Sequence, residues 1–383
     1  MIYLDHNATT PLDPAVKNAI NEAEDHFCNS SGSYGESLVS KGYLDTARMK
    51  ISNLLDVRSQ QVIFTSGSTE AVTLAIWNSM LNAPSNRRRV IVGSIEHKAV
   101  LETVRIASKV LGFNVDYLNS DSSGQYVIEE LKNLLNGDDV ALVCCMFANN
   151  ETGVIQQIEE ISQLTKHYGI ELLCDTTQIF GRVDKSYVLK ELDYYCMSAH
   201  KFYGPKGVGA LVINSGSIRT FKSVIPGGGQ EFGVRGGTSN VPGIWGLATA
   251  SELFAIPSQN RFFNAKRQID MLVEGAKAIH PTTKINGDVH TKLPNTVNLM
   301  FKGLVADEIL VSLKEVQASK ASACTAGVDE PSHVLLGMGL SYEDAEASIR
   351  FSTGKSTTDE DIRRALLDLS EAISRVRSFN GSN

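Results

Sequence analysis

The 383-residue sequence lacks features that mark several specialised classes of protein. No apolar run approaches the length of a membrane span, so we expect no transmembrane helix. Lysine and arginine number 36 against 43 aspartates and glutamates, giving a net charge of −7, so we expect neither direct nucleic-acid binding nor membrane binding. The N-terminal "MIYLDHNATTPLDP" has no basic leader and no small-residue cleavage site, and we expect no signal peptide.

Cysteine is also scarce. The six cysteines form no CxxC pair, and four of them, Cys144, Cys145, Cys174 and Cys196, lie in apolar, strand-like runs. This pattern favours a reducing, cytoplasmic location in which most thiols are simply buried. We expect no metal site.

The apolar pattern predicts two domains. Short apolar runs alternate with amphipathic segments from about Gln61 to Ile213, which predicts an α/β fold with a mostly parallel, helix-covered sheet. After the glycine-rich stretch 226–243 and a long helical region, the pattern changes to that of a smaller α+β unit. We expect a large domain over 14–250 and a small domain formed by 1–13 and 251–383.

Polar residues follow three of the predicted strands, at the sheet edge where ligands bind in such folds. "SGSTE", after "QVIFT", could cradle an anion at a helix N-terminus or could be a plain helix cap. Asp175 follows "IELLC" and could pair with a cation or cap a helix. Lys201 follows "DYYCMSAH" and is either a surface lysine or a buried amine that can form a Schiff base.

An amine, an acid and an anion cradle at one sheet edge together suit pyridoxal phosphate. That cofactor needs an amine for its aldehyde, an acid facing its pyridine nitrogen and an anion site for its phosphate. The three strand ends therefore predict a pyridoxal-phosphate site with Lys201 as the covalent anchor.

The whole chain resembles the group I cysteine desulfurases of the NifS/IscS type, which are fold-type I, class V pyridoxal-phosphate enzymes. The resemblance is carried by nine motifs in the expected order: "YLDHNATTPLDP", "VIFTSGSTEA", "IEHKAVLETVR", "FANNETGVIQ", "CDTTQIFGRV", "MSAHKFYGPKGVGAL", "RGGTSNVPGI", "SACTAGVDEPSHVL" and "ASIRFSTGK". It implies a large cofactor-binding domain, a smaller C-terminal domain that carries the catalytic-cysteine loop, and a homodimer.

The resemblance also implies roles for individual residues. Lys201 matches the Schiff-base lysine, Asp175 the partner of the pyridine nitrogen, and Gln178 the group bonded to the phenolic oxygen. His97 matches the catalytic histidine stacked on the ring, although it could instead be a plain helix-start histidine. The phosphate-binding positions correspond to Ser68, Thr69, Ser198, His200 and, from the neighbouring subunit, Thr238. Asn150, beside cofactor and substrate, and Arg350, gripping the substrate carboxylate, complete the set; a surface arginine is the alternative for Arg350.

Cys324 matches the family's nucleophile, with an inert buried thiol as the alternative. The implied reaction removes sulfur from L-cysteine, releases L-alanine and leaves a persulfide on Cys324 for an acceptor in iron–sulfur assembly, tRNA thiolation or DNA phosphorothioation. The alternatives are selenocysteine lysis, another class V reaction such as amino transfer, or a non-catalytic carrier with the same fold.

The chain departs from the family pattern near the expected entrance of the active site. Cys28–Gly35 is about two residues shorter than the usual stretch and lacks its proline and histidine, and Lys320 replaces a small residue four positions before Cys324. The substitutions in "DTTQ" and "SAHK" remove no catalytic group.

Overall fold

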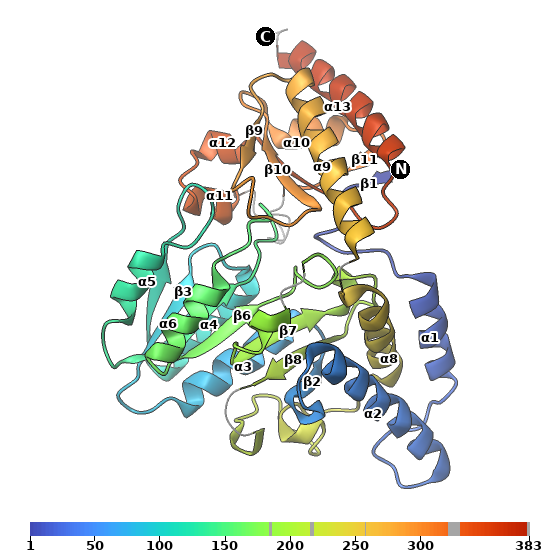
Figure 1. Ribbon diagram of the computed structural model, residues 1–383, viewed down its shortest axis with the longest axis vertical. Coiled ribbons are helices and arrows are strands. Elements are labelled where there is room, and N and C mark those ends of the chain that lie inside the picture. The colour runs from blue at the N-terminus through green and yellow to red at the C-terminus, as the bar shows by residue number, and fades with distance from the viewer. Residues whose placement is uncertain (184–185, 215–217, 257, 321–329, 381–383) are drawn as a thin grey trace.

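The computed structural model describes residues 1–183, 186–214, 218–256, 258–320 and 330–380, and Figure 1 shows the arrangement of their elements. A seven-stranded sheet is the largest element within these residues, with strand order β2-β8-β7-β6-β5-β3-β4. Its strands are β2 (Val62–Thr65), β3 (Arg89–Gly93), β4 (Asn114–Leu118), β5 (Val140–Met146), β6 (Glu171–Asp175), β7 (Tyr194–Ser198) and β8 (Gly209–Ile213). The pairs from β4 to β7 are parallel, whereas β8 is antiparallel to both β2 and β7. The predicted fold class is confirmed.

Helices cover both faces of this sheet, as its apolar composition requires. One face packs against α3 (Ser68–Asn82) and α4 (Lys98–Leu111). The other packs against helices that include α1 (Pro14–Glu24), α2 (Gly35–Leu55), α5 (Ile128–Leu135), α6 (Ile158–His167) and α8 (Val241–Ala250). Successive strand residues point to opposite faces, so Cys144 belongs to one core and Cys145 to the other. The four strand cysteines are fully buried, as predicted.

A separate core underlies the remaining elements, at the top of Figure 1. Its three-stranded antiparallel sheet, in the order β12-β10-β9, packs with the long helices α9 and α13. The elements are β9 (Lys284–Asn286), β10 (Thr296–Met300), β12 (Ser348–Ser352), α9 (Gln259–Ile279), α10 (Ala306–Ser312) and α13 (Asp359–Asn380). The short helices α11 (His333–Gly337) and α12 (Tyr342–Glu346) instead bury side chains in a core of the large sheet. A short helix, α7 (Ser186–Leu189), lies between β6 and β7, and a π-helical turn, Ser251–Ala255, follows α8.

The N-terminal arm connects the two units. Strand β1 (Ile2–Tyr3) pairs in parallel with β11 (Val316–Gln317), and Ile2 and Leu4 join the core of the smaller unit. A few residues later, the backbone N–H of Thr10 donates to the His200 carbonyl at 2.8 Å, beside the end of β7. The arm therefore belongs to the small unit at its start and lies against the large sheet by residue 10. The predicted domain boundaries stay a prediction.

No helix of the described residues combines the length and the apolarity that a membrane crossing requires.

Candidate active site

A cavity of about 500 Å³ opens where the carboxyl ends of β5, β6 and β7 meet the N-terminal arm and β12. Ten of the twelve residues that the sequence predicted for the site line this one cavity: Ser68, Thr69, His97, Asn150, Asp175, Gln178, Ser198, His200, Lys201 and Arg350. They come from segments up to 282 positions apart (350 − 68), and only the fold brings them together.

The N-terminus of α3 forms one wall of the cavity. Gly67 is its N-cap, and the Ser68 hydroxyl accepts a hydrogen bond from the Thr177 hydroxyl at 2.7 Å. Gly209 allows β8 to approach this turn, since a Cβ there would lie 2.8 Å from the Gly67 Cα and 2.4 Å from the Met197 carbonyl oxygen. Free N–H groups at a helix start attract anions. This wall has the donors that a phosphate needs, and it is also an ordinary helix start, so its role as a phosphate site stays a prediction.

Lys201 lies in a short 3-10 turn, Ala199–Lys201, directly after β7. Its ammonium group donates to the carbonyl oxygens of Asn7 at 2.8 Å and Ala8 at 2.9 Å, so the N-terminal arm fixes its position. The residue is half-buried and lines the cavity. A snorkelling surface lysine would not be held in this way.

His200 precedes Lys201 and stays neutral near pH 7. Burial, together with the nearby charges of Lys201 and Lys206, lowers the pKa of the imidazole to about 4. Its Nδ1 lies 3.1 Å from the Thr9 hydroxyl. A neutral imidazole on this wall can donate one hydrogen bond to a bound anion.

Asp175 and His97 lie at neighbouring strand ends. The Asp175 carboxylate accepts from the Thr177 backbone N–H at 2.9 Å and from the Cys196 thiol at 3.4 Å. His97 is the N-cap of α4, and its Nδ1 accepts from the Ala99 N–H at 3.1 Å. Burial lowers the pKa of His97, while Asp175 opposes that shift. The neutral imidazole therefore carries its proton on Nε2. His97 is both a helix cap and a cavity residue, so the two interpretations made from the sequence are compatible.

Gln178 has a fixed amide orientation. Its Nε2 donates to the Asn7 carbonyl at 3.1 Å, and its Oε1 accepts from the buried Arg182 guanidinium. Because a guanidinium can only donate, it forces the amide oxygen toward itself. Sequence analysis missed Arg182, which follows Gln178 by four residues in "QIFGR".

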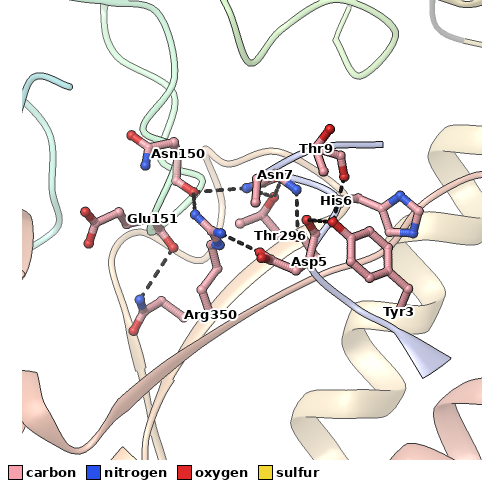
Figure 2. Close-up of polar contacts among 12 residues, drawn as sticks. Tyr3, Asp5, His6, Asn7, Thr9, Asn150, Glu151, Thr296 and Arg350 are labelled. Carbon is pink, nitrogen blue, oxygen red and sulfur yellow. Dashed lines mark hydrogen bonds and ion pairs between the residues drawn. The ribbon is translucent and has the colours of Figure 1, made fainter. Parts of the chain in front are cut away.

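Arg350 projects from β12 into the same cavity, and Figure 2 shows its guanidinium between Asp5 and the Asn150 backbone. Nη1 donates to the Asn150 carbonyl at 3.0 Å, and Nη2 pairs with the Asp5 carboxylate. The side chain is only 4% exposed, which excludes a surface arginine. Nε is buried without a partner in the described chain. A carboxylate that enters here meets a guanidinium already held in place.

Glu96 is a second acid close to Asp175, but it is neutral near pH 7. Its buried carboxyl accepts from the Tyr126 hydroxyl and the Met146 N–H. Burial raises its pKa to about 8, against the smaller lowering effect of the Tyr126 hydrogen bond. Asp175 and Asp5 are thus the acids among the residues that line the cavity.

The other two predicted residues are not in this cavity. Thr238 is exposed and is absent from the cavity lining of its own chain. Cys324 lies outside the described residues. Lys320 is the last described residue before Cys324 in the sequence. Its ammonium group pairs with Asp307 at 2.6 Å and Glu346 at 3.0 Å. Burial alone would lower the pKa of Lys320, but these two hydrogen bonds outweigh it and raise the pKa.

Sequence analysis also missed six polar cavity residues, three of them in the N-terminal arm: Asp5, Asn7, Thr9, Thr177, Lys206 and Ser319. Asp5, Asn7 and Thr9 belong to the quoted motif "YLDHNATTPLDP", so the signal was present without a role attached to it.

Comparisons with known proteins agree with this geometry. The family model "Aminotransferase class-V" matches residues 2–365. A cysteine desulfurase of Frankia sp. (strain EuIK1) is 38% identical over 392 residues, covering 100% of this chain and 93% of the relative. A solved NifS-like protein superposes with a TM-score of 0.89 at 32% identity, over 97% of this chain and 99% of the other. A structure titled "SspA in complex with cysteine" gives a TM-score of 0.80 at 31% identity, over 92% and 98%. The resemblance predicted from the motifs is confirmed.

Proposed function

The chain belongs to the class V aminotransferase family, and from this premise we propose that it is a cysteine desulfurase that uses pyridoxal phosphate. Cysteine and an enzyme thiol give alanine and an enzyme persulfide. The Cβ–S bond of cysteine breaks, a proton takes the place of sulfur on carbon, and an S–S bond forms on the enzyme.

Support comes above all from the single cavity that holds ten of the predicted residues. Its donor set fits pyridoxal phosphate. Lys201 supplies the amine, Asp175 the carboxylate for the pyridine nitrogen, and the α3 start with Ser198 and His200 the phosphate wall. When bound, the cofactor supplies an electron sink for negative charge on the substrate.

Gln178 presents an N–H donor to the phenolic oxygen because Arg182 holds the amide oxygen. His97, neutral and protonated on Nε2, lines the cavity with an aromatic ring whose pKa responds to the charge of Asp175. Both side chains enter the reaction already oriented, so little ordering is needed when the substrate arrives.

Arg350 and Asn150 position the substrate. The Arg350 guanidinium grips the carboxylate of cysteine, in a site where Asp5 and the Asn150 carbonyl fix its direction. The Lys201 amine then removes the α-proton of the bound amino acid. The Cys324 thiolate attacks the substrate sulfur and carries it away as the persulfide.

We also propose that the protein acts as a homodimer and passes its persulfide sulfur to an acceptor protein. Thr238 is exposed and outside the cavity of its own chain, which suits a hydroxyl that serves the neighbouring subunit. Arg235 holds this loop by an ion pair with Glu70 of α3, 2.6 Å between Nε and Oε1. Equilibrium sedimentation of the active enzyme tests the dimer, which an active monomer would contradict. The cytoplasmic location stays a prediction.

The experiment that tests the cofactor site is borohydride reduction of the purified enzyme followed by peptide mapping. The pyridoxyl group should be found on Lys201. Lys206, which lines the same cavity, is the internal control. A pyridoxyl group on Lys206 or on any other lysine would overturn the assignment.

A further inference from the structure

A second cavity, of about 90 Å³, shares Lys201 with the active-site cavity. Its volume equals that of about three water molecules. Its lining comes from seven separated segments: the N-terminal arm, the turn after β6, the turn from Lys201 to Tyr203, the π-helical turn, the start of α9, the turn before β10 and the turn after β12. The large sheet and the smaller unit therefore both contribute to it.

The charged side chains that line this cavity are cations. Arg182, Arg261, Lys355 and Lys201 belong to the lining, and no aspartate or glutamate of the described chain does. Lys355 is paired with Asp13, a residue outside the lining. The cavity thus differs from the active-site cavity, whose lining contains both acids and cations.

The two guanidinium groups meet only neutral oxygens in the described chain. Arg182 donates to the Gln178 backbone carbonyl at 3.0 Å, to the Gln178 side-chain oxygen, to the His6 carbonyl at 3.3 Å and to the Lys201 carbonyl at 3.5 Å. Arg261 donates to the carbonyls of Leu253 at 3.3 Å and Ile256. Both cations lie close enough to Tyr203 for their charges to act on its phenol. Arg182 is buried, and burial lowers its pKa to about 10, which still leaves it charged at neutral pH.

Uncommitted hydrogen-bonding atoms surround the same space. His6 Nδ1, Arg261 Nε and the Thr353 hydroxyl are buried without a partner in the described residues. The Tyr203 hydroxyl accepts from the Lys355 N–H at 2.7 Å, and its own proton remains to be donated. His6 is neutral, because burial and the Arg182 charge hold its pKa at about 4 against the smaller, opposing effect of a hydrogen bond with the Tyr3 backbone.

We propose that this cavity binds a compact oxyanion of the phosphate and sulfate class. Arg182 is a buried cation without a counter-charge among the described residues, which is unfavourable, and water alone can hydrogen-bond to it without neutralising it. Donors from several directions suit the four oxygens of a tetrahedral ion better than the two of a planar carboxylate. The volume admits such an ion and excludes a molecule the size of the cofactor.

The bound ion would connect the large sheet, through the Tyr203 hydroxyl and the charge of Arg182, to the smaller unit, through Arg261 and Thr353. A ligand that binds the folded chain alone raises its stability in proportion to the logarithm of the ligand concentration. Sulfate should therefore raise the melting temperature of the cofactor-loaded enzyme, whose cofactor phosphate already fills the other anion site.

The test is a thermal-unfolding titration of the loaded enzyme with sulfate, phosphate, acetate and chloride at matched ionic strength. Sulfate and phosphate should raise the melting temperature along a saturating curve, and chloride and acetate should not. Arg261→Met should weaken sulfate binding roughly tenfold or more, because it removes a charge-assisted donor. Thr353→Val should weaken it less and serves if Arg261→Met does not fold. Arg105→Met, in an exposed pair with Glu102, is the matched control.

Crystals soaked in selenate provide the second readout, with anomalous density expected between Arg182 and Arg261. Equal effects of sulfate and chloride, stabilisation by acetate as strong as by sulfate, or identical curves for Arg261→Met and Arg105→Met would each overturn the proposal. Alanine formation does not enter these measurements, so their outcome is independent of the proposed desulfurase activity.

Discussion

The two cavities that share Lys201 differ in the signs of the charges around them. The larger one sets the acids Asp5 and Asp175 against the cations Lys201, Lys206 and Arg350. Among the described residues, the charged side chains that line the smaller one are all cations. A site of mixed sign suits a zwitterionic amino acid and a cofactor that carries both an anionic phosphate and a protonated ring, whereas a purely cationic site suits a simple anion. Charge pattern thus separates an active site from an anion site on either side of one lysine.

Removing the acid at the centre of the larger cavity should have the largest effect. Asp175→Ala should lower the rate of alanine formation roughly 10²- to 10³-fold, because the pyridine nitrogen loses its counter-charge. Cofactor content should change little, since Lys201 and the α3 wall remain. The measurements are steady-state kinetics and cofactor quantification, with Asp270→Ala, in an exposed pair with Lys266, as the control. A wild-type rate with bound cofactor would show that the mixed-sign site does not depend on this acid.

Removing Arg350, the cation that faces the substrate, should have a smaller effect, mainly on substrate binding. Arg350→Gln should raise the KM for cysteine roughly 10- to 100-fold, because it removes a charge-assisted pair of hydrogen bonds to the substrate carboxylate. The kcat should fall less than the KM rises. Arg363→Gln, whose guanidinium pairs with Glu360 on the exposed face of α13, is the matched control. An unchanged KM would mean that a group other than Arg350 binds the carboxylate of the substrate.

Sequence reasoning gave most of the architecture because the signals were local. The apolar run "VALVCCM" became β5, "DYYCMS" contains β7 and "SIRFS" became β12. A buried parallel strand needs a continuous apolar run, and such runs bounded by polar turns are readable without knowledge of their neighbours.

The contacts that orient the site could not be predicted in the same way. Asp5 lies 345 positions from Arg350, and the Asn7 carbonyl lies 194 positions from Lys201. Such pairings depend on how the N-terminal arm crosses the finished fold, and no local pattern encodes that path. Arg182 escaped notice for a related reason, since a cation normally predicts a surface position and here it is buried.

Replacing Glu96, the buried acid beneath the larger cavity, should have the smallest effect of these substitutions. It tests whether the Glu96 carboxyl is neutral in the folded protein. Glu96 has a folded-state pKa of about 8, raised above its value in the unfolded chain by burial. Its contribution to stability is therefore complete below about pH 4.5 and is lost as the pH rises toward 8. Glu96→Gln cannot ionise and keeps an oxygen for Tyr126 and Met146.

This variant should consequently be more stable than the wild type at about pH 8, by on the order of 1–3 kcal/mol, and should differ less at about pH 5. Denaturant unfolding at the two pH values measures this difference in the free energy of unfolding. If the difference were the same at both pH values, Glu96 would already be ionised in the folded protein, and the larger cavity would have a third charged acid beneath it.

The most direct test of the desulfurase assignment is mass spectrometry of the enzyme after treatment with cysteine. The account predicts one extra sulfur on Cys324 of the wild type and none on Cys28, the half-buried cysteine outside the sheet. Cys324→Ser should keep its cofactor, bind cysteine and form alanine at background rate, because a serine hydroxyl is far less ionised than a thiol near neutral pH. A persulfide on Cys28, or wild-type alanine formation by Cys324→Ser, would contradict the account.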